Sequence, residues 1–522
     1  MQSLGVVPIF VSAGAAVLPT LVAAVTSVVA IILKPRELIR LCREKPMVVG
    51  MSVSCLMGIC GLGWLIFTSP VRAARQNASQ PPAHYDWAKV AEDILARQAL
   101  AAIPTPATEP AKNGQAVVLG HDFSRASFDG NIAPIHLARL WSYQPEDTMF
   151  LSDPAVFGNR VYVAGCQSDL GGYTGLLACV DFETGKTIWE TTRLGDELLK
   201  PFFSSPAITA DGKNLIIGQG LHEDRDCALL CFDTSTGKLR WSVKTSIHIE
   251  SSPAISGDIV VVGAGAIEGK TGKPTGDPGF VLAVRISDGK ELWRQTVNDA
   301  ESAPAIDETG MVYIGSGFNG NAVVALRSDL PEELQSKKIE RIAWKTAVEV
   351  PVTGPITLAG ELVISGGGNG DVVHSNKDAR GLVTAMDRKT GQIKWQTPFE
   401  DSVLGFVAFR NDLLVCPIRN GEVVALSAKD GRVIWRTRVS GTSPVIAGCA
   451  FAESRIYSVS SDGYLAVLDA KDGKIIEKTY LNDQAKPGTG LTMSMPQVVN
   501  GLVIVGSETG GVRAYAGSGD AR

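Results

Sequence analysis

The chain has 522 residues, of which 45% are hydrophobic and 20% are charged, and its formal net charge is −5. This length exceeds that of a usual single domain and allows a large core. The mild charge and the lack of basic runs argue against nucleic acid as a partner. The six His residues are scattered and show no local spacing typical of a zinc site.

Two long uncharged segments occupy the start of the chain. No charged residue occurs in residues 1–33 or in residues 47–71, and each segment is long enough for a membrane-spanning helix of about 20 residues. A cleaved secretory leader would begin with basic residues and contain a shorter apolar stretch. We therefore expect a two-helix transmembrane anchor over residues 1–70.

The distribution of positive charge predicts the orientation of this anchor. Five positive residues lie between the two helices: Lys34, Arg36, Arg40, Arg43 and Lys45. Only Arg72 and Arg75 closely follow the second helix. Because positive residues favour the cytoplasmic side, we expect an inner-membrane protein whose later domain faces the periplasm. Residues 71–120 are predicted to form a helix and a Pro-rich linker.

Residues 121–522 repeat two short motifs. In the first, Gly lies four residues before Trp, as in DFETGKTIWET (Gly185, Trp189) and DTSTGKLRWSV (Gly237, Trp241). In the second, a small or polar pair precedes Pro. This motif occurs at Pro154, Pro206, Pro253, Pro304, Pro355, Pro444 and Pro496. Phe406 stands where one further Pro is expected, so the motifs mark eight units, spaced by about forty to fifty residues.

Each unit contains short apolar and β-branched runs bounded by Gly, Asp or Asn, which predict strands. Four strands per unit and eight units predict an all-β, eight-bladed β-propeller over residues 121–522. The eighth unit lacks its fourth strand, whereas a lone Trp strand, LARLWSYQPE with Trp141, precedes the first unit. We expect the strand of Trp141 to complete the last blade, which would leave no open sheet edge.

The tryptophans are expected to join neighbouring blades. Asp and Gly suit a tight turn, because Gly tolerates the positive φ that such a turn needs. An indole on the outer strand can pack on the turn of the next blade and bury about 200 Å². We assign this structural role to Trp141, Trp189, Trp241, Trp293, Trp344, Trp395 and Trp435. The seventh unit has Glu477 at this position, where we expect a weaker contact.

The recurring Asp–Gly–Trp and Ser-x-Pro-Ala-Ile motifs resemble the PQQ-like repeat family of eight-bladed propellers, over about four hundred residues. Two groups of that family are relevant. Quinoprotein alcohol dehydrogenases bind pyrroloquinoline quinone and calcium, whereas propellers such as BamB are non-catalytic scaffolds of outer-membrane β-barrel assembly. The dehydrogenase resemblance implies an adjacent Cys-Cys pair and often a Cys-x-x-Cys-His haem motif. Neither motif occurs among the nine Cys residues.

The resemblance therefore favours a BamB-like protein-interaction scaffold with a protein partner in the cell envelope, no cofactor and no catalytic residues. A quinone- and calcium-dependent dehydrogenase and a ligand-binding sensor are the alternatives. The cysteines leave two readings open as well. Cys166 and Cys179 either form a bridge between neighbouring strands or stay free as core thiols.

The position three residues before each Pro motif is expected to line the central channel. The eight residues are Leu151, Phe203, Glu250, Glu301, Val352, Val403, Gly441 and Met493. Only Glu250 and Glu301 are ionisable, and they are either solvated rim residues or the ligands of a cation such as calcium. Several long polar loops, 219–227, 266–280 and 366–381, are expected on the same face. Since function concentrates on such loops, we expect them to contact the partner.

Overall fold

The computed structural model describes residues 116–118, 122, 128–129, 133–169, 172–222, 224–266, 276–370, 372, 375, 377–441, 443–481 and 492–517. All of them belong to one compact unit of the chain, Pro106–Arg522. The anchor predicted over residues 1–70 and most of the linker predicted over residues 71–120 lie outside the described residues. Within the described residues, no helix is both long and apolar enough to span a bilayer.

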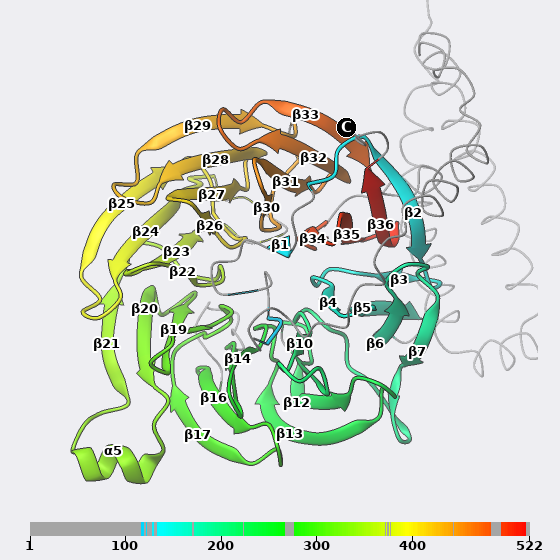
Figure 1. Ribbon diagram of the computed structural model, residues 1–522. Coiled ribbons are helices and arrows are strands. Elements are labelled where there is room, and N and C mark those ends of the chain that lie inside the picture. Colours follow the sequence, from blue (N-terminus) through cyan, green and yellow to red (C-terminus); the bar gives the residue numbers. More distant parts are fainter. Residues whose placement is uncertain are drawn as a thin grey trace, which may run out of the picture. The chain divides into compact units, whose positions relative to one another are not determined.

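Eight sheets surround a central axis, and each forms one blade (Figure 1). From the axis outward, blades 1 to 4 contain β4 (Ala155–Phe157), β5 (Arg160–Asp169), β6 (Gly172–Asp181) and β7 (Thr187–Thr191); β10 (Ala207–Ile208), β11 (Asn214–Gly218), β12 (Arg225–Asp233) and β13 (Leu239–Ile247); β14 (Ala254–Ser256), β15 (Ile259–Ala264), β16 (Phe280–Arg285) and β17 (Glu291–Thr296); β18 (Ala305–Ile306), β19 (Met311–Ser316), β20 (Ala322–Arg327) and β21 (Ile342–Ala347).

Blades 5 to 8 continue the same order around the ring. They contain β22 (Thr357–Ala359), β23 (Leu362–Gly368), β24 (Gly381–Asp387) and β25 (Ile393–Phe399); β26 (Ala408–Arg410), β27 (Leu413–Ile418), β28 (Glu422–Ser427) and β29 (Val433–Arg438); β30 (Ala450–Ala452), β31 (Arg455–Ser460), β32 (Tyr464–Asp469) and β33 (Ile475–Tyr480); β34 (Gln497–Val499), β35 (Leu502–Ser507), β36 (Gly511–Gly517) and β2 (Leu137–Tyr143).

The middle strands are buried on both faces, which explains their continuous apolar sequences. In β16 the first five residues are all buried, whereas β17 on the outer edge is partly exposed. A strand that is covered on both sides needs no polar face, so its sequence does not alternate. Among the described residues eight hydrophobic clusters result, and each includes residues of neighbouring blades.

The ring closes between the two ends of the propeller sequence. β2 pairs antiparallel with β36, and Trp141 lies opposite Ala514. Figure 1 shows β2 in cyan beside β36 in red. On the inner side, β1 (Phe128–Asp129) adds a parallel partner to β34. The predictions of an eight-bladed all-β propeller and of a last blade completed by the strand of Trp141 are confirmed.

The seven tryptophans form an outer ring of contacts between blades. Each indole N–H donates to a backbone carbonyl of the next blade at 2.7–3.2 Å. The accepting carbonyls, in order from Trp141 to Trp435, belong to Phe182, Thr234, Ile286, Ser328, Arg388, Ala428 and Ala470. In six of these contacts the ring also lies against the Gly of the turn. Gly237, with φ +68°, has no Cβ, and an added one would lie 2.5 Å from Cε3 of Trp189.

Glu477 of blade 7 makes a different contact. Its carboxylate accepts hydrogen bonds from the backbone N–H groups of His136 and Leu137, at the start of β2. β36 and β2 come from opposite ends of the propeller sequence, so blade 8 has no Asp–Gly turn between its outer strands on which an indole could pack. A carboxylate suits this position, because it can accept the N–H groups that a strand start leaves free.

Serine side chains form a second, inner ring of contacts. Ser204 donates to the carbonyl of Ser251 at 3.0 Å, and Ser251 donates to the carbonyl of Ser302 at 3.1 Å. Between blades 8 and 1, the N–H of Met495 donates to Asp153 at 2.7 Å. These bonds explain the Ser-x-Pro sequence motif, because they hold the inner strands of neighbouring blades in register around the axis.

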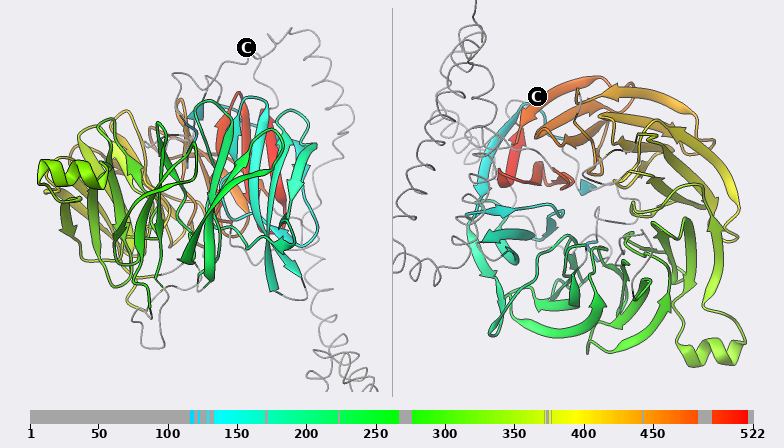
Figure 2. Two further views of the ribbon diagram at one scale, coloured as in Figure 1. Left: turned by 90° about the horizontal axis from the view of Figure 1, so that it is seen from below. Right: turned by 180° about the vertical axis from the view of Figure 1, so that it is seen from behind.

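Helix α5 (Pro331–Lys337) lies in the connection between β20 and β21 and projects from the margin of the ring (Figure 2).

The six cysteines of the described propeller are free and buried. Cys166 lies opposite Gly175 and Cys179 lies opposite Tyr162. The two residues are therefore not cross-strand partners, and the bridge considered between them does not form.

Candidate functional site

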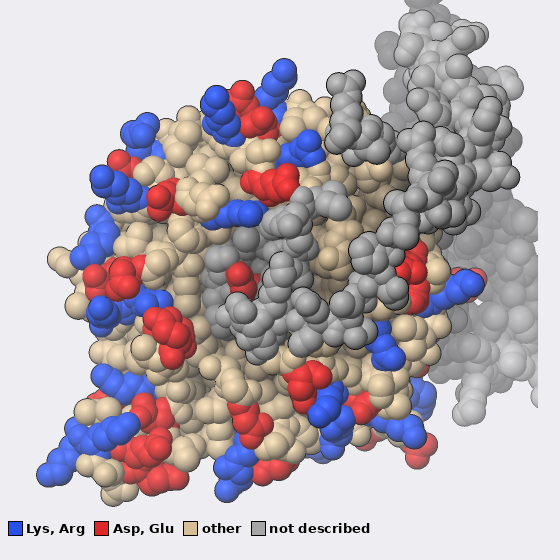
Figure 3. All heavy atoms as spheres, in the orientation of Figure 1, with Lys and Arg blue, Asp and Glu red and all other residues tan. Residues whose placement is uncertain are grey.

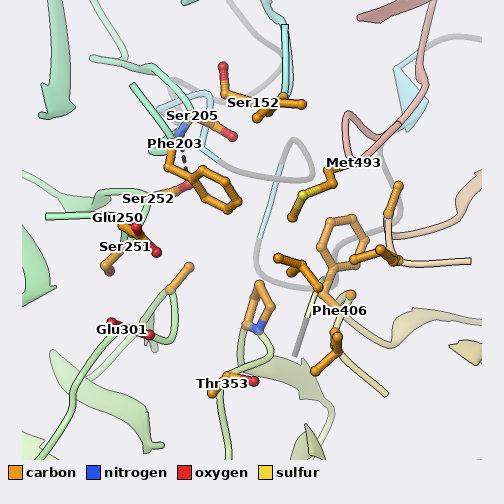
Figure 4. A pocket seen from close by; sticks show the side chains of 18 of the residues that line it. Ser152, Phe203, Ser205, Glu250, Ser251, Ser252, Glu301, Thr353, Phe406 and Met493 are labelled. Atoms are coloured by element: carbon orange, nitrogen blue, oxygen red, sulfur yellow. Dashed lines mark hydrogen bonds between the residues drawn. The ribbon is translucent and has the colours of Figure 1, made fainter. Parts of the chain in front are cut away.

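A cavity of about 730 Å³ lies among the inner ends of the blades (Figure 4). Its wall includes five of the eight predicted channel residues: Leu151, Phe203, Glu250, Glu301 and Met493. The cavity has two chemically different sides. Figure 4 shows the carboxylates of Glu250 and Glu301 on one side and the side chains of Phe406 and Met493 on the other.

Two histidines lie beside the predicted carboxylates. Nδ1 of His222 lies 3.2 Å from Oε1 of Glu301, and Nε2 of His248 lies 3.1 Å from the same oxygen. The three ligand atoms lie within 4.8 Å of one another. The centres of the two imidazole rings are 5.2 Å apart.

Three successive blades supply this cluster. His222 follows β11 in the loop to β12 of blade 2, His248 follows β13 at the entry to blade 3, and Glu301 precedes β18 of blade 4. Exposure increases toward the opening: the side chain of His248 is 0% exposed, that of Glu301 15% and that of His222 49%. The cluster thus has a buried end fixed by the fold and an open end that faces solvent.

The carboxylates and imidazoles of the cluster shift one another's pKa values. Burial by itself would raise the pKa of Glu301, but hydrogen bonds to His222 and His248 outweigh burial and lower this pKa to about 2. The bond to Glu301 in turn raises the pKa of His222 to about 9. Burial, reinforced by the Glu301 charge, raises the pKa of Glu250 to about 7. The hydrogen bonds therefore favour the ionised form of Glu301 and the protonated form of His222.

Glycine at position 265 keeps the space beside the cluster open. A Cβ at Gly265 would lie 2.3 Å from Oε1 of Glu301 and 2.6 Å from Nε2 of His248. The next residue, Ala266, donates its N–H to Asp299 at 3.2 Å. Asp299 is buried and also lines the cavity. At Gly265 the backbone of blade 3 therefore lies closer to the cluster than any residue with a Cβ would allow.

The sequence profile of the family described as "Outer membrane protein assembly factor BamB" matches residues 137–372 and 379–522. These two segments include strands of all eight blades and well over half of the chain. The chain belongs to this BamB family. The resemblance to PQQ-like repeat propellers inferred from the Trp and Pro motifs is thereby confirmed.

Individual relatives are distant in sequence. The chain is 24% identical to BamB of Yersinia pestis over 54% of the chain and 65% of that protein, and 24% identical to BamB of Burkholderia pseudomallei over 56% and 79%. It is 29% identical to the dehydrogenase subunit of a quinone alcohol dehydrogenase of Gluconobacter oxydans, over 35% of the chain and 23% of that subunit. The chain therefore spans less than two thirds of the length of the Yersinia pestis protein and of the Gluconobacter oxydans subunit.

Solved structures of both groups share the fold. BamB from Moraxella catarrhalis superposes with a TM-score of 0.54 at 17% identity, over 74% of this chain and 99% of that one. Quinohemoprotein alcohol dehydrogenase from Comamonas testosteroni gives a TM-score of 0.58 at 15% identity, over 83% and 85%. At 15–17% sequence identity this likeness shows a common propeller fold and does not indicate a shared activity.

The cavity of this BamB-family member is a poor match to pyrroloquinoline quinone. That cofactor is a tricarboxylate, and its charge calls for cationic side chains. Among the described residues of the wall there is no Lys or Arg, and the ionisable side chains are those of Asp153, His222, Glu250, Asp299 and Glu301. No described residue of the wall therefore offers a Lys or Arg side chain to pair with the carboxylates of the quinone.

The face that carries the cavity also carries the loops between second and third strands. His222 and Asn369, from two of these loops, line the cavity wall. The hairpin of blade 1 has long strands on this face: β5 and β6 have ten residues each, whereas β15 and β16 have six. Tyr173 near its tip is 55% exposed. Figure 3 shows the other face, which carries α5, and there acidic and basic side chains are mixed rather than gathered in one patch.

Sequence reasoning found the two carboxylates but missed the two histidines. Glu250 and Glu301 lie at equivalent positions of successive units, so the repeat itself identified them. His222 and His248 are 79 and 53 residues from Glu301, and no local spacing connects them. One signal was present: His222 lies in a loop between second and third strands, and such loops surround the axis of a propeller.

Proposed function

We propose that this chain is a membrane-anchored, periplasm-facing scaffold that binds a protein partner in the cell envelope. The observation that carries the proposal is the match of the BamB family profile to segments that include all eight blades. The name of that family refers to outer-membrane protein assembly, so the partner proposed here is a protein of the envelope assembly machinery.

The geometry of the propeller supports a docking role. The outer ring of indole contacts and the inner ring of serine contacts tie each blade to its neighbours. A rigid body of this kind can present loops without deforming. The blade 1 hairpin offers an exposed Tyr173, and Tyr is enriched at protein interfaces. We infer that the partner contacts this hairpin and the neighbouring loops on the cavity face.

The anchor belongs to the same proposal. The two uncharged segments within residues 1–70, and the five positive residues between them, support insertion into the inner membrane with the loop in the cytoplasm. The propeller then faces the periplasm, tethered by the Pro-rich linker.

Affinity purification of the tagged full-length chain tests the docking surface. In the test variant, Asn-Gly replaces residues 168–173. Ser168 pairs with Tyr173, so this replacement shortens the hairpin and leaves the register of Gln167 and Thr174 intact. The control variant carries Glu332→Ala and Gln335→Ala on α5. Because successive antiparallel connections lie at opposite ends of the strands, α5 belongs to the other face.

The expected result is one envelope protein that co-purifies with the wild type and with the α5 variant, and that is lost from the shortened-hairpin variant. Equal thermal unfolding midpoints of the three proteins exclude misfolding as the cause. Co-purification that is unchanged by shortening the hairpin contradicts the docking surface. The absence of any partner together with quinone-dependent dye reduction contradicts the scaffold.

A second candidate function is a quinone-dependent dehydrogenase, which the 29% identity to the Gluconobacter oxydans subunit favours. The lack of Lys and Arg among the described residues of the cavity wall opposes it. Addition of pyrroloquinoline quinone and Ca²⁺ to the purified chain, followed by an absorbance scan, distinguishes the two. We expect no bound quinone after gel filtration, and stoichiometric retention would favour the dehydrogenase instead.

A further inference from the structure

We propose that His222, His248 and Glu301 form a binding site for a divalent transition metal ion of the Zn²⁺ class, at the edge of the axial cavity. The proposal concerns a ligand of the propeller itself and does not depend on the scaffold function. It rests on the positions of three side chains, on the space that Gly265 leaves open and on the chemistry of the donor atoms.

The distances suit a small tetrahedral ion. Zn²⁺ binds imidazole nitrogen and carboxylate oxygen at about 2.0–2.2 Å, so two ligands of one tetrahedral ion lie about 3.3 Å apart. The observed separations from Oε1 of Glu301 are 3.2 Å to Nδ1 of His222 and 3.1 Å to Nε2 of His248. Small side-chain movements would therefore place the three donor atoms around one ion.

The donor set selects the class of metal. Ca²⁺ takes six to eight oxygen ligands, whereas two imidazoles and one carboxylate are typical of Zn²⁺ and neighbouring transition metals. The calcium expectation from Glu250 and Glu301 alone thus changes once the histidines are included. Nearby Glu250 and Asp299 add carboxyl oxygens to the cavity wall, which favours a cation.

The fold holds the cluster in place before any metal binds. Ser251, next to Glu250, donates to the carbonyl of Ser302, next to Glu301. His248 is fully buried, whereas His222 is half exposed. An ion bound here would have protein ligands on its buried side and an open coordination position toward the cavity, which a water molecule or a small anionic ligand would occupy.

A metal-free cluster is the competing explanation. In that case the two imidazoles only donate hydrogen bonds to Glu301 and help to join blades 2, 3 and 4. This explanation predicts an effect of substitutions on stability and none on metal uptake, so metal binding itself separates the two.

The test is titration of the metal-free full-length chain with Co²⁺, followed by displacement with Zn²⁺. Co²⁺ in a tetrahedral nitrogen and oxygen site absorbs visible light strongly, which reports geometry as well as binding. The variants are His222→Gln and Gly265→Ala, which fills the space beside Oε1 of Glu301 while leaving every ligand residue present. His136→Gln is the matched control, because His136 is exposed and lies outside the cluster.

We expect one equivalent of Co²⁺ with a tetrahedral spectrum, displaced by Zn²⁺ and not by Ca²⁺. Affinity should fall at least about tenfold in His222→Gln and Gly265→Ala, and stay unchanged in His136→Gln. Circular dichroism establishes that each variant is folded. Three results would overturn the proposal: no Co²⁺ uptake at micromolar concentration by the wild type, equal uptake by His222→Gln, or displacement by Ca²⁺.

Discussion

Single glycines determine how closely the blades can approach. Gly237 combines a φ of +68° with direct contact between its backbone and the indole of Trp189. A residue with a Cβ would therefore be disfavoured twice, once by the left-handed backbone and once by the ring. The Gly–Trp pairs are thus a single device, in which the small residue of one blade accommodates the large residue of the previous one.

Substitution of Gly237 by Ala separates these two effects when compared with Gly257→Ala. Gly257 also has a positive φ, of +57°, but a Cβ there meets no atom within 4 Å. We expect Gly257→Ala to lower the free energy of unfolding by about 1–2 kcal/mol from backbone strain alone. Gly237→Ala should cost about 2–4 kcal/mol because overpacking against Trp189 is added. Denaturant unfolding monitored by Trp fluorescence measures both. Equal losses would mean that the indole contact is unimportant.

The residues of the candidate site differ in how far the sequence predicts them. Glu250 and Glu301 follow from counting positions in the repeat. His222 and His248 come together only because blades 2, 3 and 4 converge on the axis, and each reaches Glu301 across many residues of chain. A search for local His spacing fails in such a fold, since proximity at the axis is created by the ring and not by one helix or hairpin.

At the scale of single elements, strand β2 is the closing piece of the ring. The sequence predicts it because the last unit lacks one strand and the first unit is preceded by one. The carboxylate of Glu477 binds the first N–H groups of β2, including that of Leu137 at 2.8 Å. The replacement of Trp by Glu in unit seven, which the sequence alone indicated as a weaker contact, is explained by the interrupted hairpin of blade 8.

Substitutions at Glu477 test this explanation. Glu477→Ala should lower the free energy of unfolding by about 1–2 kcal/mol and speed hydrogen exchange at the amide of Leu137, because two N–H groups lose their acceptor. Glu477→Gln keeps an acceptor oxygen and should lose less. Glu477→Trp restores the residue of the other blades, but blade 8 offers it no Asp–Gly turn. If Glu477→Trp were as stable as the wild type, the closing role of the carboxylate would be refuted.

The strand pattern was predictable because it depends on short-range sequence, namely apolar runs, turn residues and a repeated Trp. Short strands that lie outside the repeated four-strand pattern were not predictable from the sequence. β3 (Thr148–Met149) and the small ribbon of β8 (Arg193–Leu194) and β9 (Glu197–Leu198) are two-residue strands. Such strands are too short to carry a periodic signal, and they form because the surrounding blades position their backbones.

At the scale of the whole molecule, the anchor and the propeller make separate predictions. We expect the full-length chain to remain in the membrane fraction after alkaline carbonate washing, because two apolar helices would span the bilayer. A variant in which a cleaved secretory leader replaces residues 1–70 should appear in the soluble periplasmic fraction. Immunoblotting of the fractions measures both. Release of the full-length chain by carbonate would contradict a spanning anchor.

The central claim is that the cavity face of the propeller binds a protein, and site-specific photocrosslinking in living cells tests it most directly. A photoreactive residue replaces Tyr173 on the cavity face or, as a control, Leu239, which begins β13 at the opposite end of the blades and is 41% exposed. The account predicts one discrete crosslinked product from position 173 and none from position 239. Identical products from both positions, or none from position 173, would contradict it.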